Sequence, residues 1–311
     1  MTIYKLPECI PAASLPEGAV LCLGNFDGVH RGHQRLFDCA LEMKDAKGAS
    51  CACAWTFTSV AKTDSSVPCL TDMSAKLRLF AEYGLDYAVF EEFVSVCDTS
   101  AADFISSYLC EGMKIAGVVC GFNFRFGKGG EGDYQLLSAL AGELGIHSIV
   151  VDAVTSEGEV ISSTLIREHI ENGNISKAAK LLGHPFSIQF PVLHGNELGR
   201  TMGIPTINQS FPEGHIIPCM GIYACTCYVN DDIYLGVANV GVRPTISDEG
   251  TVNCETHIIN YSGDLYDKEI RVEFYERLRE EMKFDSLDAL RRQIRIDISE
   301  CLDYFATEFG E

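Results

Sequence analysis

The sequence lacks the features that would place the chain in a membrane, in an oxidising compartment or among low-complexity proteins. No apolar run reaches the length of a membrane span, and residues 1–20 hold one lysine and no apolar stretch typical of a signal peptide. No internal repeat occurs. None of the 14 cysteines forms a C-x-x-C pair, and "CACAW" and "ACTCYV" stand in apolar runs, which indicates reduced core residues rather than a zinc site or disulfides. We therefore expect a soluble cytoplasmic protein.

The chain is long enough, and apolar enough, for two folded domains. It has 311 residues, of which 47% are hydrophobic, and a formal net charge of −20. This charge argues against non-specific binding to nucleic acid or to an anionic membrane. Small anionic ligands are compatible with it, because they need only a local arginine, a metal ion or backbone N–H groups.

The first half alternates apolar runs with helical patterns, which is typical of βαβ units and a parallel sheet. We expect strands at 19–24, 50–57, 86–90, 115–121 and 147–154. We expect helices at 30–47, 74–84, 101–109, 133–145, 163–172 and 175–182.

After Gly183 the rhythm changes to short strand-like runs split by turns. These runs lie at 187–194, 221–229, 233–240, 252–260 and 268–278, with a hairpin turn in "VNDDIY". A final helix, about 286–305, starts with a serine cap and carries Leu287, Leu290, Ile294 and Leu302 on one predicted face. The pattern predicts domains 1–182 and 183–311, the second a small antiparallel β-barrel or sandwich with a C-terminal helix.

The string "GNFDGVHRGH" at 24–33 joins a buried strand to a helix through a glycine-rich turn. Ligands of open α/β sheets bind at the carboxyl ends of strands, where helix N-termini offer N–H groups to anions. His30 and His33 are three residues apart and share one face of the first helical turn. Two imidazoles there could stabilise a phosphate that gains charge in a transition state. A tight turn with two surface histidines is the simpler alternative, but the whole string disfavours it.

A second motif, "ISSTLIR" at 161–167, also suits phosphates. Ser163 or Thr164 would cap a helix, and Arg167 would lie about one turn in. The helix dipole and the guanidinium together suit a triphosphate. A simple cap and a solvated helix face explain the same residues equally well.

The string "GKGGEG" at 127–132 fits G-x-G-x-x-G, and Asp152 follows at a suitable distance. A dinucleotide-binding site is therefore an alternative reading of the first half. It is disfavoured because "FNFRF" separates the glycines from the preceding strand.

No P-loop string exists, so a kinase here would need another phosphate site. "HGNELGRTMGIPTINQ" at 194–209 places Gly195, Gly199 and Gly203 before a strand on which Thr206 and Asn208 face the same side. A hydroxyl and an amide oxygen could hold Mg²⁺. The polar face of an ordinary edge strand is the alternative that periodicity alone favours.

The first half resembles the nucleotidyltransferase superfamily with a Rossmann-like fold through its H-x-G-H string. "GNFDGVHRGHQ", "GFNFRFGKGGEGD" and "ISSTLIR" are similar to the FMN adenylyltransferase half of bacterial bifunctional riboflavin kinase/FAD synthetases. The resemblance implies that His30 and His33 stabilise the α-phosphate of ATP and that Arg167 holds the pyrophosphate. It implies flavin contacts at Asn123, Phe124 and Arg125. It also implies nucleotide contacts at Gly24, Asn25, Phe26, Asp27, Gly28, Ser163 and Thr164.

The second half resembles riboflavin kinases in "GRTMGIPTIN", "VGVRPTI", "CETHIIN" and "LYDKEIRVEFYERLREEMKF". The resemblance implies that Glu255 is the catalytic base and that Arg279 and Phe284 contact flavin. It implies that Thr206 and Asn208 contact Mg-ATP. Nucleotide contacts are implied at Gly195, Gly199, Arg200 and Gly203.

Together the resemblances imply phosphorylation of riboflavin by ATP, with Mg²⁺, and adenylylation of the resulting FMN to FAD. Two departures stand in the first half: the family's Pro-His-Pro stretch is missing after Phe57, and Asn123 stands where many members have aspartate. A kinase with a weak adenylyltransferase half and a non-catalytic flavin-binding regulator are therefore alternatives. The sequence predicts no oligomeric state.

Overall fold

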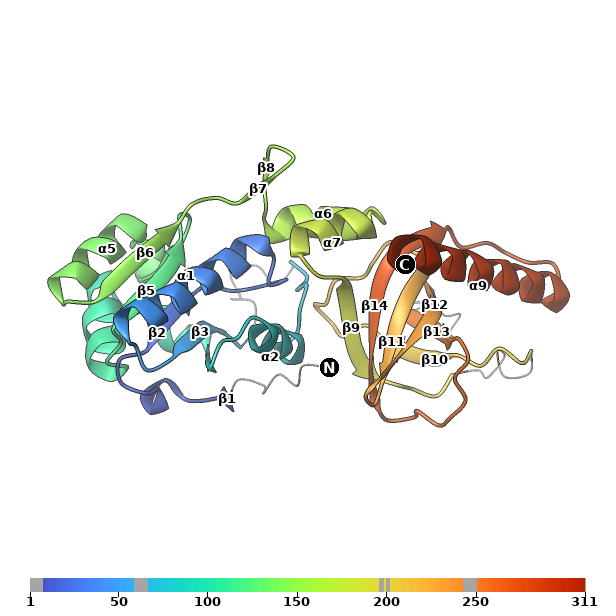
Figure 1. The fold of residues 1–311 in the computed structure, drawn as a ribbon, viewed down its shortest axis with the longest axis horizontal. Coiled ribbons are helices and arrows are strands. Elements are labelled where there is room, and N and C mark those ends of the chain that lie inside the picture. Colours follow the sequence, from blue (N-terminus) through green and yellow to red (C-terminus); the bar gives the residue numbers. More distant parts are fainter. Residues whose placement is uncertain (1–7, 59–66, 196–198, 200–201, 243–250, 311) are drawn as a thin grey trace. The chain divides into compact units, whose positions relative to one another are not determined.

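The computed structural model describes residues 8–58, 67–195, 199, 202–242 and 251–310 (Figure 1). Its contacts divide the chain into two compact units, Met1–Ser163 and Thr164–Glu311. The division falls before the boundary predicted at residue 183, so the predicted domain limits stay a prediction. Among the described helices, none is both long and apolar enough to cross a membrane.

The first unit contains the predicted alternation of strands and helices. Its strands are β1 (Glu8–Cys9), β2 (Val20–Leu23), β3 (Ala52–Phe57), β4 (Tyr87–Glu91), β5 (Gly117–Gly121) and β6 (His147–Val151), with a hairpin of β7 (Thr155–Ser156) and β8 (Glu159–Val160). Its helices are η1 (Ala12–Ser14), α1 (Arg31–Lys47), α2 (Met73–Glu82), α3 (Phe93–Val96), α4 (Ala101–Asp103), η2 (Phe104–Gly112), η3 (Lys128–Gly130) and α5 (Tyr134–Glu143).

Six of these strands form one parallel sheet in the order β1-β4-β3-β2-β5-β6. The chain runs outward from β2 through β3 to β4 and then returns to β5 on the other side of β2. Strand order therefore reverses between β2 and β5, which is where open α/β sheets bind ligands. The Rossmann-like fold predicted for this half is confirmed.

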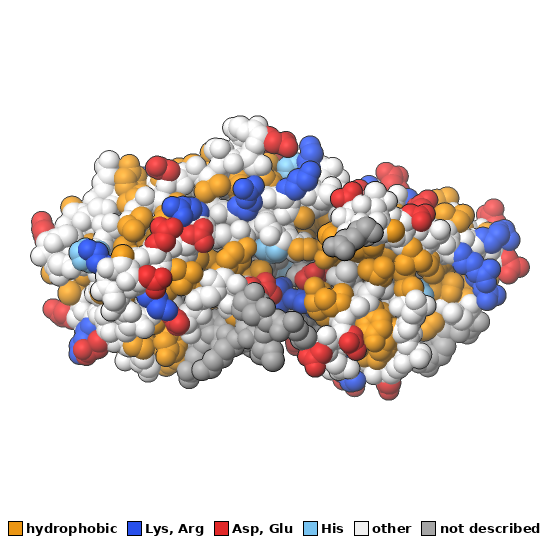
Figure 2. Space-filling view, viewed as in Figure 1, with side chains coloured by type: hydrophobic (Ala, Val, Ile, Leu, Met, Phe, Trp, Pro, Cys, Tyr) orange, Lys and Arg blue, Asp and Glu red, His pale blue; other side chains and the backbone are white. Residues whose placement is uncertain are grey.

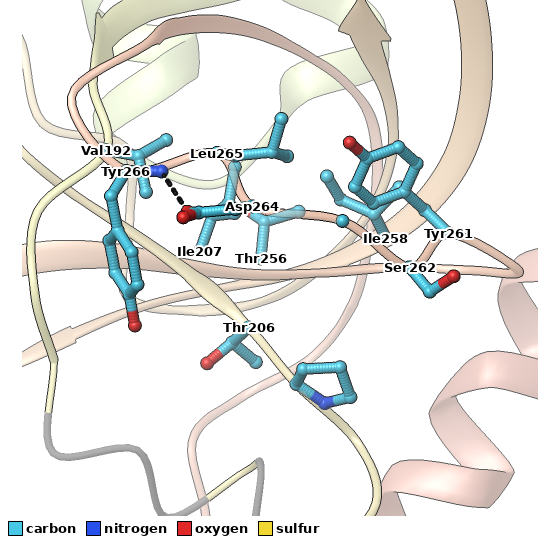
Figure 3. Close-up of a pocket in the computed structure, with 12 residues that line it drawn as sticks. Val192, Thr206, Ile207, Thr256, Ile258, Tyr261, Ser262, Asp264, Leu265 and Tyr266 are labelled. Atoms are coloured by element: carbon cyan, nitrogen blue, oxygen red, sulfur yellow. Dashed lines mark hydrogen bonds between the residues drawn. The ribbon is translucent and has the colours of Figure 1, made fainter.

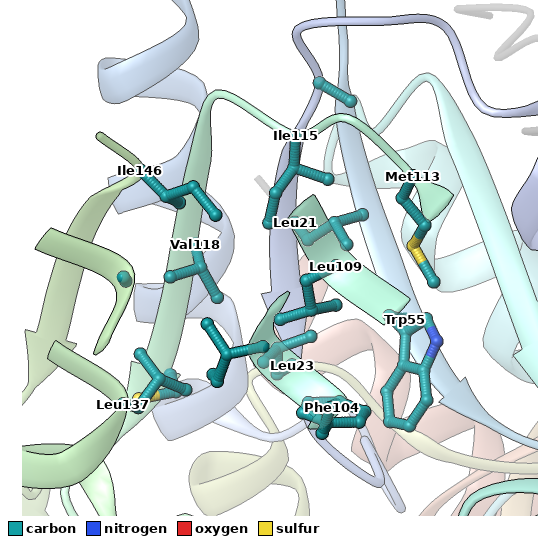
Figure 4. Close-up of a cluster of buried hydrophobic side chains, with 14 of the residues drawn as sticks. Leu21, Leu23, Trp55, Phe104, Leu109, Met113, Ile115, Val118, Leu137 and Ile146 are labelled. Atoms are coloured by element: carbon teal, nitrogen blue, oxygen red, sulfur yellow. The ribbon is translucent and has the colours of Figure 1, made fainter. Parts of the chain in front are cut away.

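Alternating side chains of the strands fill two cores, one on each face of the sheet. Val20 and Cys22 face the core that contains α1 and α2. Leu21 and Leu23 face the core that contains η2 and α5, where Phe104, Leu109 and Leu137 meet the strands (Figure 4). The sheet is buried on both faces, as its continuous apolar strands require.

The second unit consists of two short helices, a barrel and a long terminal helix. The helices are α6 (Ser163–Glu171), whose first residue closes the first unit, α7 (Ile175–Leu182) and α9 (Leu287–Phe309). The strands are β9 (Phe186–Pro191), β10 (Ile207–Ser210), β11 (Gly221–Val229), β12 (Asp232–Val242), β13 (Val252–Ile258) and β14 (Glu269–Arg279).

The six strands form an antiparallel sheet in the order β10-β13-β12-β11-β14-β9. Its first and last strands meet just beyond β9, where the Leu193 N–H donates to the Asn208 carbonyl at 2.8 Å. This bond nearly closes the sheet into a barrel, so the barrel predicted for the second half is confirmed.

The C-terminal helix is confirmed, and its predicted apolar face is right for two of the four residues. Ser286 caps the helix, since its side chain accepts from the Ala289 N–H. Leu290 and Ile294 are half-buried and line a cavity, whereas Leu287 and Leu302 are 55% and 41% exposed. The fully buried residues of α9 are Asp297, Cys301 and Phe305. Hydrophobicity did not indicate that an aspartate belongs to the inner face.

All 14 cysteines lie in the described ranges and are free. Burial raises the pKa of Cys120 to about 11 and that of Cys254 to about 12, so both thiols stay protonated at neutral pH. Nine of the 14 are buried and have the small-residue core role that the sequence predicts, whereas Cys9 is exposed.

On the surface shown in Figure 2, acidic and basic side chains are interspersed in both units. Basic side chains gather at the N-terminal end of α9, where Arg291, Arg292 and Arg295 are exposed.

Candidate active sites

The loop that follows β2 is held in a strained conformation. Phe26 and Val29 have φ angles of 50° and 42°, in the left-handed region that a β-branched residue rarely adopts. Both side chains are fully buried. Core packing therefore maintains a backbone shape that costs about 1–3 kcal/mol per residue, as is typical of functional loops.

Asp27 fastens this loop to the segment that precedes α2. Its buried Oδ1 accepts from the backbone N–H groups of Leu70 at 2.8 Å and Thr71 at 3.2 Å. The Gly28 N–H donates to the Thr71 hydroxyl at 3.0 Å. Asp27 thus has a structural task that the sequence analysis did not assign, and its nucleotide contact stays a prediction.

Lys76 of α2 was missed by the sequence analysis. Its Nζ donates to the Asn25 carbonyl at 2.8 Å, and the Thr56 hydroxyl donates to the same carbonyl at 2.9 Å. The side chain is only 4% exposed, and burial lowers its pKa while Asp27 opposes the shift. The pattern of apolar residues in α2 does not indicate that Lys76 points into the core.

The second motif meets the first at this loop. The Ser163 hydroxyl donates to the Asp27 carbonyl at 2.8 Å, and α6 begins at Ser163. The cap position is therefore Ser162, one residue before the predicted candidates Ser163 and Thr164. Arg167 lies one turn into α6, in the second unit, and its role stays a prediction.

His30 and His33 lie together at the start of α1, with their rings stacked at 3.6 Å between centroids. His30 is the N-cap, and its Nδ1 accepts from the His33 N–H. A neutral His30 therefore carries its proton on Nε2, which makes that nitrogen a donor. Burial lowers the pKa of His33 well below its usual value, and His30 and Lys76 lower it further, so His33 is neutral at neutral pH.

Two buried polar atoms of this site have no hydrogen-bond partner in the described structure. They are Asn25 Oδ1 and His33 Nδ1. Buried polar atoms are normally paired, so each exception needs an explanation. Both atoms belong to the string "GNFDGVHRGH", and a bound polar ligand that reorients these side chains would explain them.

An aromatic cavity of about 530 Å³ adjoins Gly24. The rings that line it belong to Trp55, Phe57, Phe93, Phe104, Phe124 and Phe126. Arg125 also lines it, whereas Asn123 is exposed. A flat aromatic ring system is the kind of ligand that such walls accommodate.

The glycines of "GKGGEG" have a packing role in this wall. A side chain at Gly127 would come within 2.8 Å of the Ala101 backbone, and one at Gly132 would meet the Phe126 ring at 2.6 Å. Gly129 and Gly130 instead have φ angles of 65° and 70°, which favour glycine. Packing and backbone conformation thus explain the glycines without a dinucleotide.

The barrel presents a polar row across three neighbouring strands. Asn208 of β10 lies opposite Glu255 of β13, and Glu255 lies opposite Asn239 of β12. Cys254 and Thr256 are buried, whereas Glu255 is partly exposed, so the predicted alternation of faces holds. Strand register thereby brings together side chains that are far apart in the sequence.

This row opens on a cavity of about 490 Å³ that is bounded by the barrel, α9 and the segment before it. Glu255, Thr206, Gly199, Arg279 and Phe284 all line it, as does Asn239. Five of the sequence-predicted residues of the second half therefore line one cavity, whereas Asn208, Gly195 and Gly203 are not among its lining residues. Arg200 lies outside the described residues.

Arg279 is clamped to the terminal helix. Its Nε and Nη2 donate to the two carboxylate oxygens of Asp297, each at 2.7 Å, and Nη1 donates to the Glu280 carbonyl at 2.8 Å. This bidentate pair is nearly buried. It fixes α9 over the cavity, and the flavin contact of Arg279 stays a prediction.

Two of the predicted glycines approach other atoms too closely for a side chain. A Cβ at Gly195 would lie 2.5 Å from Asn208 Nδ2, and one at Gly199 would lie 2.4 Å from the Ile204 carbonyl oxygen. Gly203 instead has a φ of 73°, which favours glycine. The loop therefore packs directly against the amide of Asn208.

Thr206 stands between the large cavity and a smaller hollow of about 70 Å³ (Figure 3). In that hollow, Asp264 accepts from the Tyr266 N–H at 3.0 Å. On the other side, His257 Nδ1 lies 2.8 Å from the Pro205 carbonyl and so supports the strand start that carries Thr206.

Comparisons with known proteins agree with this division into two sites. A family model for FAD synthetase matches residues 12–165, and a model for riboflavin kinase matches residues 182–305. The bifunctional riboflavin kinase/FMN adenylyltransferase of Escherichia coli (strain K12) is 36% identical over 295 residues, which cover 93% of each chain. The protein of that name from Bacillus subtilis (strain 168) is 32% identical over 297 residues, again 93% of each chain.

The chain belongs to the bifunctional riboflavin kinase/FMN adenylyltransferase family. A solved structure, of a macrolide-efflux protein from Streptococcus pneumoniae, is also similar, with a TM-score of 0.84 and 28% identity. It covers 95% of this chain and 98% of that chain.

The family assignment is consistent with the oxygen-rich wall of the kinase cavity. Thr206 and Asn208 offer a hydroxyl and an amide oxygen, which are ligands that Mg²⁺ accepts, and Glu255 adds a carboxylate to the wall. Among the described residues, no cluster of three or more histidines, cysteines or carboxylates could hold a metal ion.

Proposed function

We infer that this chain makes FAD from riboflavin in two ATP-dependent steps. The barrel transfers the γ-phosphoryl group of ATP to riboflavin, giving FMN and ADP. The Rossmann-like unit transfers AMP from a second ATP to FMN, giving FAD and pyrophosphate. The observation that carries this conclusion is the presence on one chain of two different phosphate-directed sites, the stacked histidine loop and the Asn208–Glu255–Asn239 row.

In the kinase half, we propose that Glu255 accepts the proton of the primary hydroxyl of riboflavin while that oxygen attacks the γ-phosphorus. Phosphoryl transfer needs mainly positioning and neutralisation of charge. Arg279 is already paired with Asp297, so it supplies little free positive charge to the phosphates. Mg²⁺ held with ATP by Thr206 and Asn208 would supply that charge.

In the adenylyltransferase half, an oxygen of the FMN phosphate attacks the α-phosphorus of ATP, and the bond to the bridging oxygen of pyrophosphate breaks. We propose that His30 and His33 donate hydrogen bonds to the α-phosphate oxygens, which gain charge in the transition state. His30 can do so because its Nδ1 is committed to the His33 N–H, leaving Nε2 protonated. The positive end of α1 adds to this stabilisation.

We assign the remaining roles as the family resemblance implies them. The aromatic cavity, with Phe124 and Arg125, would take the flavin ring of FMN. Gly24, Asn25, Phe26 and Gly28 would line the ATP phosphates, and Arg167 would bind the leaving pyrophosphate. In the barrel, Gly195, Gly199 and Gly203 would let ATP approach the backbone, and Phe284 would contact riboflavin. We place the enzyme in the cytoplasm, where its free cysteines stay reduced.

The test is incubation of the purified protein with riboflavin, ATP and Mg²⁺, followed by chromatography of the flavins. FAD is the expected product. FMN alone would support a kinase with an inactive adenylyltransferase half. No product would indicate a flavin-binding regulator and would reject the proposed activity.

A further inference from the structure

Asn253 is a buried amide beside the kinase row that the motifs do not include. It stands two residues before Glu255 on β13, so its side chain is on the same face of the strand. Its partners in register are Ser210 and Gly241. The residue is only 6% exposed, which is unusual for an asparagine without a hydrogen-bonding task.

One atom of Asn253 reaches both proposed catalytic neighbours. Its Nδ2 lies 3.4 Å from Asn208 Oδ1 and 3.4 Å from Glu255 Oε1. An amide NH₂ group has two N–H bonds, so it can donate to both acceptors at once. Catalytic hydrogen bonds are often long without substrate and shorten in the reactive complex. The two contacts are consistent with one amide group that holds Asn208 and Glu255 in fixed relative positions.

The side chain of Asn253, which contacts the proposed base Glu255, is uncharged. The charged or titratable groups around the same cavity are Arg279, Asp297, Glu281 and His257. Arg279 is committed to Asp297, and His257 Nδ1 lies against the Pro205 carbonyl. An amide donor orients the carboxylate without placing another protein charge beside it.

We propose that Asn253 is a positioning residue of the kinase site, which fixes the metal-binding amide of Asn208 relative to the carboxylate of Glu255. This inference rests on the proposed kinase function. When Asn208 Oδ1 faces a cation, its second lone pair still accepts from Asn253. The same NH₂ group holds the carboxylate of Glu255 in one orientation. Partners of this kind typically change metal affinity or activity by about 10- to 100-fold.

The first test is Asn253→Asp, which keeps the shape of the side chain but replaces both donors by an acceptor. The kcat for riboflavin phosphorylation should fall about 10- to 100-fold, with a much smaller change in KM for riboflavin. The Mg²⁺ concentration for half-maximal rate should rise. FAD formation from supplied FMN should be unchanged, which shows that the other unit is intact. Asn253→Ser, which keeps one short donor, should show a smaller loss of the same kind.

The second test exchanges donor and acceptor in the double variant Asn253→Asp/Glu255→Gln. The new amide at position 255 can donate to the new carboxylate at position 253. The melting temperature, measured in EDTA without substrates, should therefore recover from the value of Asn253→Asp toward that of the unmodified protein. At saturating Mg²⁺ the kinase rate should equal that of Glu255→Gln alone, because the effect of Asn253 on kcat then acts through Glu255.

The proposal is overturned if Asn253→Asp and Asn253→Ser keep the normal kcat and Mg²⁺ dependence. It is also overturned if the kinetic losses of the two single variants multiply in the double variant, as a purely structural role predicts. Failure of the proposed function looks different: the unmodified protein would make no FMN, or Glu255→Gln would retain full kinase activity, whatever Asn253 does.

Discussion

The loop between Gly24 and His33 gathers its polar groups from ten consecutive residues, whereas the barrel wall takes Asn208, Glu255 and Asn239 from three strands. The loop fixes its groups through backbone strain, a helix cap and buried anchors such as Asp27. The wall fixes its groups through strand register, so each position depends on distant pairings. A site built on one turn is therefore disturbed mainly by changes within that turn. A site built across strands is disturbed by any change that shifts the pairing of the sheet.

The sharpest way to separate the two sites is Glu255→Gln. The substitution removes the base but nearly preserves volume and polarity, so riboflavin phosphorylation should fall about 10²- to 10⁴-fold. FAD formation from supplied FMN should keep its normal rate. Chromatographic rates from the two starting flavins check this. Efficient FMN production would reject the base role, and equal loss from both flavins would point to misfolding.

The reciprocal change is His30→Ala or His33→Ala in the loop. Each should lower FAD formation from FMN by roughly 10²-fold or more, the scale of losing one preorganised donor. FMN formation from riboflavin should hardly change. His30→Ala also removes the cap of α1 and should cost about 0.5–2 kcal/mol of stability, which His33→Ala should not. Near-normal FAD synthesis in both variants would contradict the assignment.

Thr206→Val tests the cation site of the wall at constant shape. Loss of the hydroxyl should reduce riboflavin phosphorylation by at least about tenfold at limiting Mg²⁺, without affecting adenylyl transfer. Thr226→Val is the matched control, because Thr226 is a buried threonine of β11 outside the cavity. If Thr206→Val and Thr226→Val had the same dependence of rate on Mg²⁺ concentration, the Thr206 hydroxyl would have no role in a cation site.

Asp27→Ala probes the anchor of the loop. It leaves the buried N–H groups of Leu70 and Thr71 without their acceptor, which should destabilise the first unit by about 1–3 kcal/mol. Asp27→Asn keeps an acceptor oxygen and should lose less. Trp55, the single tryptophan, lies in the core of the first unit and reports its unfolding in urea by fluorescence. If both variants had the urea midpoint of the unmodified protein, the hydrogen bonds of Asp27 would contribute nothing to stability.

The smallest expected effect is a pH dependence of the loop. Burial holds the pKa of His33 below the ordinary value of 6.5, so the unfolded chain takes up this proton more readily than the folded chain. The stabilising contribution is complete above pH 6.5 and is lost as pH falls toward the folded value. Urea midpoints at about pH 7.5 and about pH 5.5 should differ less for His33→Gln than for the unmodified protein. An equal difference would show that His33 is not the titrating group.

The two sites also differ in how far the sequence could predict them. The main strands and helices of the first unit follow from contiguous apolar patterns, whereas the contact of Ser163 with Asp27 was not predicted. Lys76, Asn253 and Asp297 were missed because each is a polar residue whose burial depends on partners that are distant in the chain. The inner face of α9 was predicted only in part for the same reason, since Asp297 is buried by its pairing with Arg279 rather than by hydrophobicity. The hydrophobic pattern of a sequence predicts which apolar residues are buried. It does not predict which polar or charged residues are buried by pairing with a distant residue.

The central claim is that one chain carries two separate active sites that share only the intermediate FMN. Its most direct test mixes Glu255→Gln with His33→Ala and supplies riboflavin, ATP and Mg²⁺. Each variant alone should make little FAD, and both should be checked with FMN as the starting flavin. The mixture should make FAD, because FMN released by the His33→Ala protein becomes the substrate of the Glu255→Gln protein. A mixture that makes no more FAD than the two variants do separately would contradict the claim.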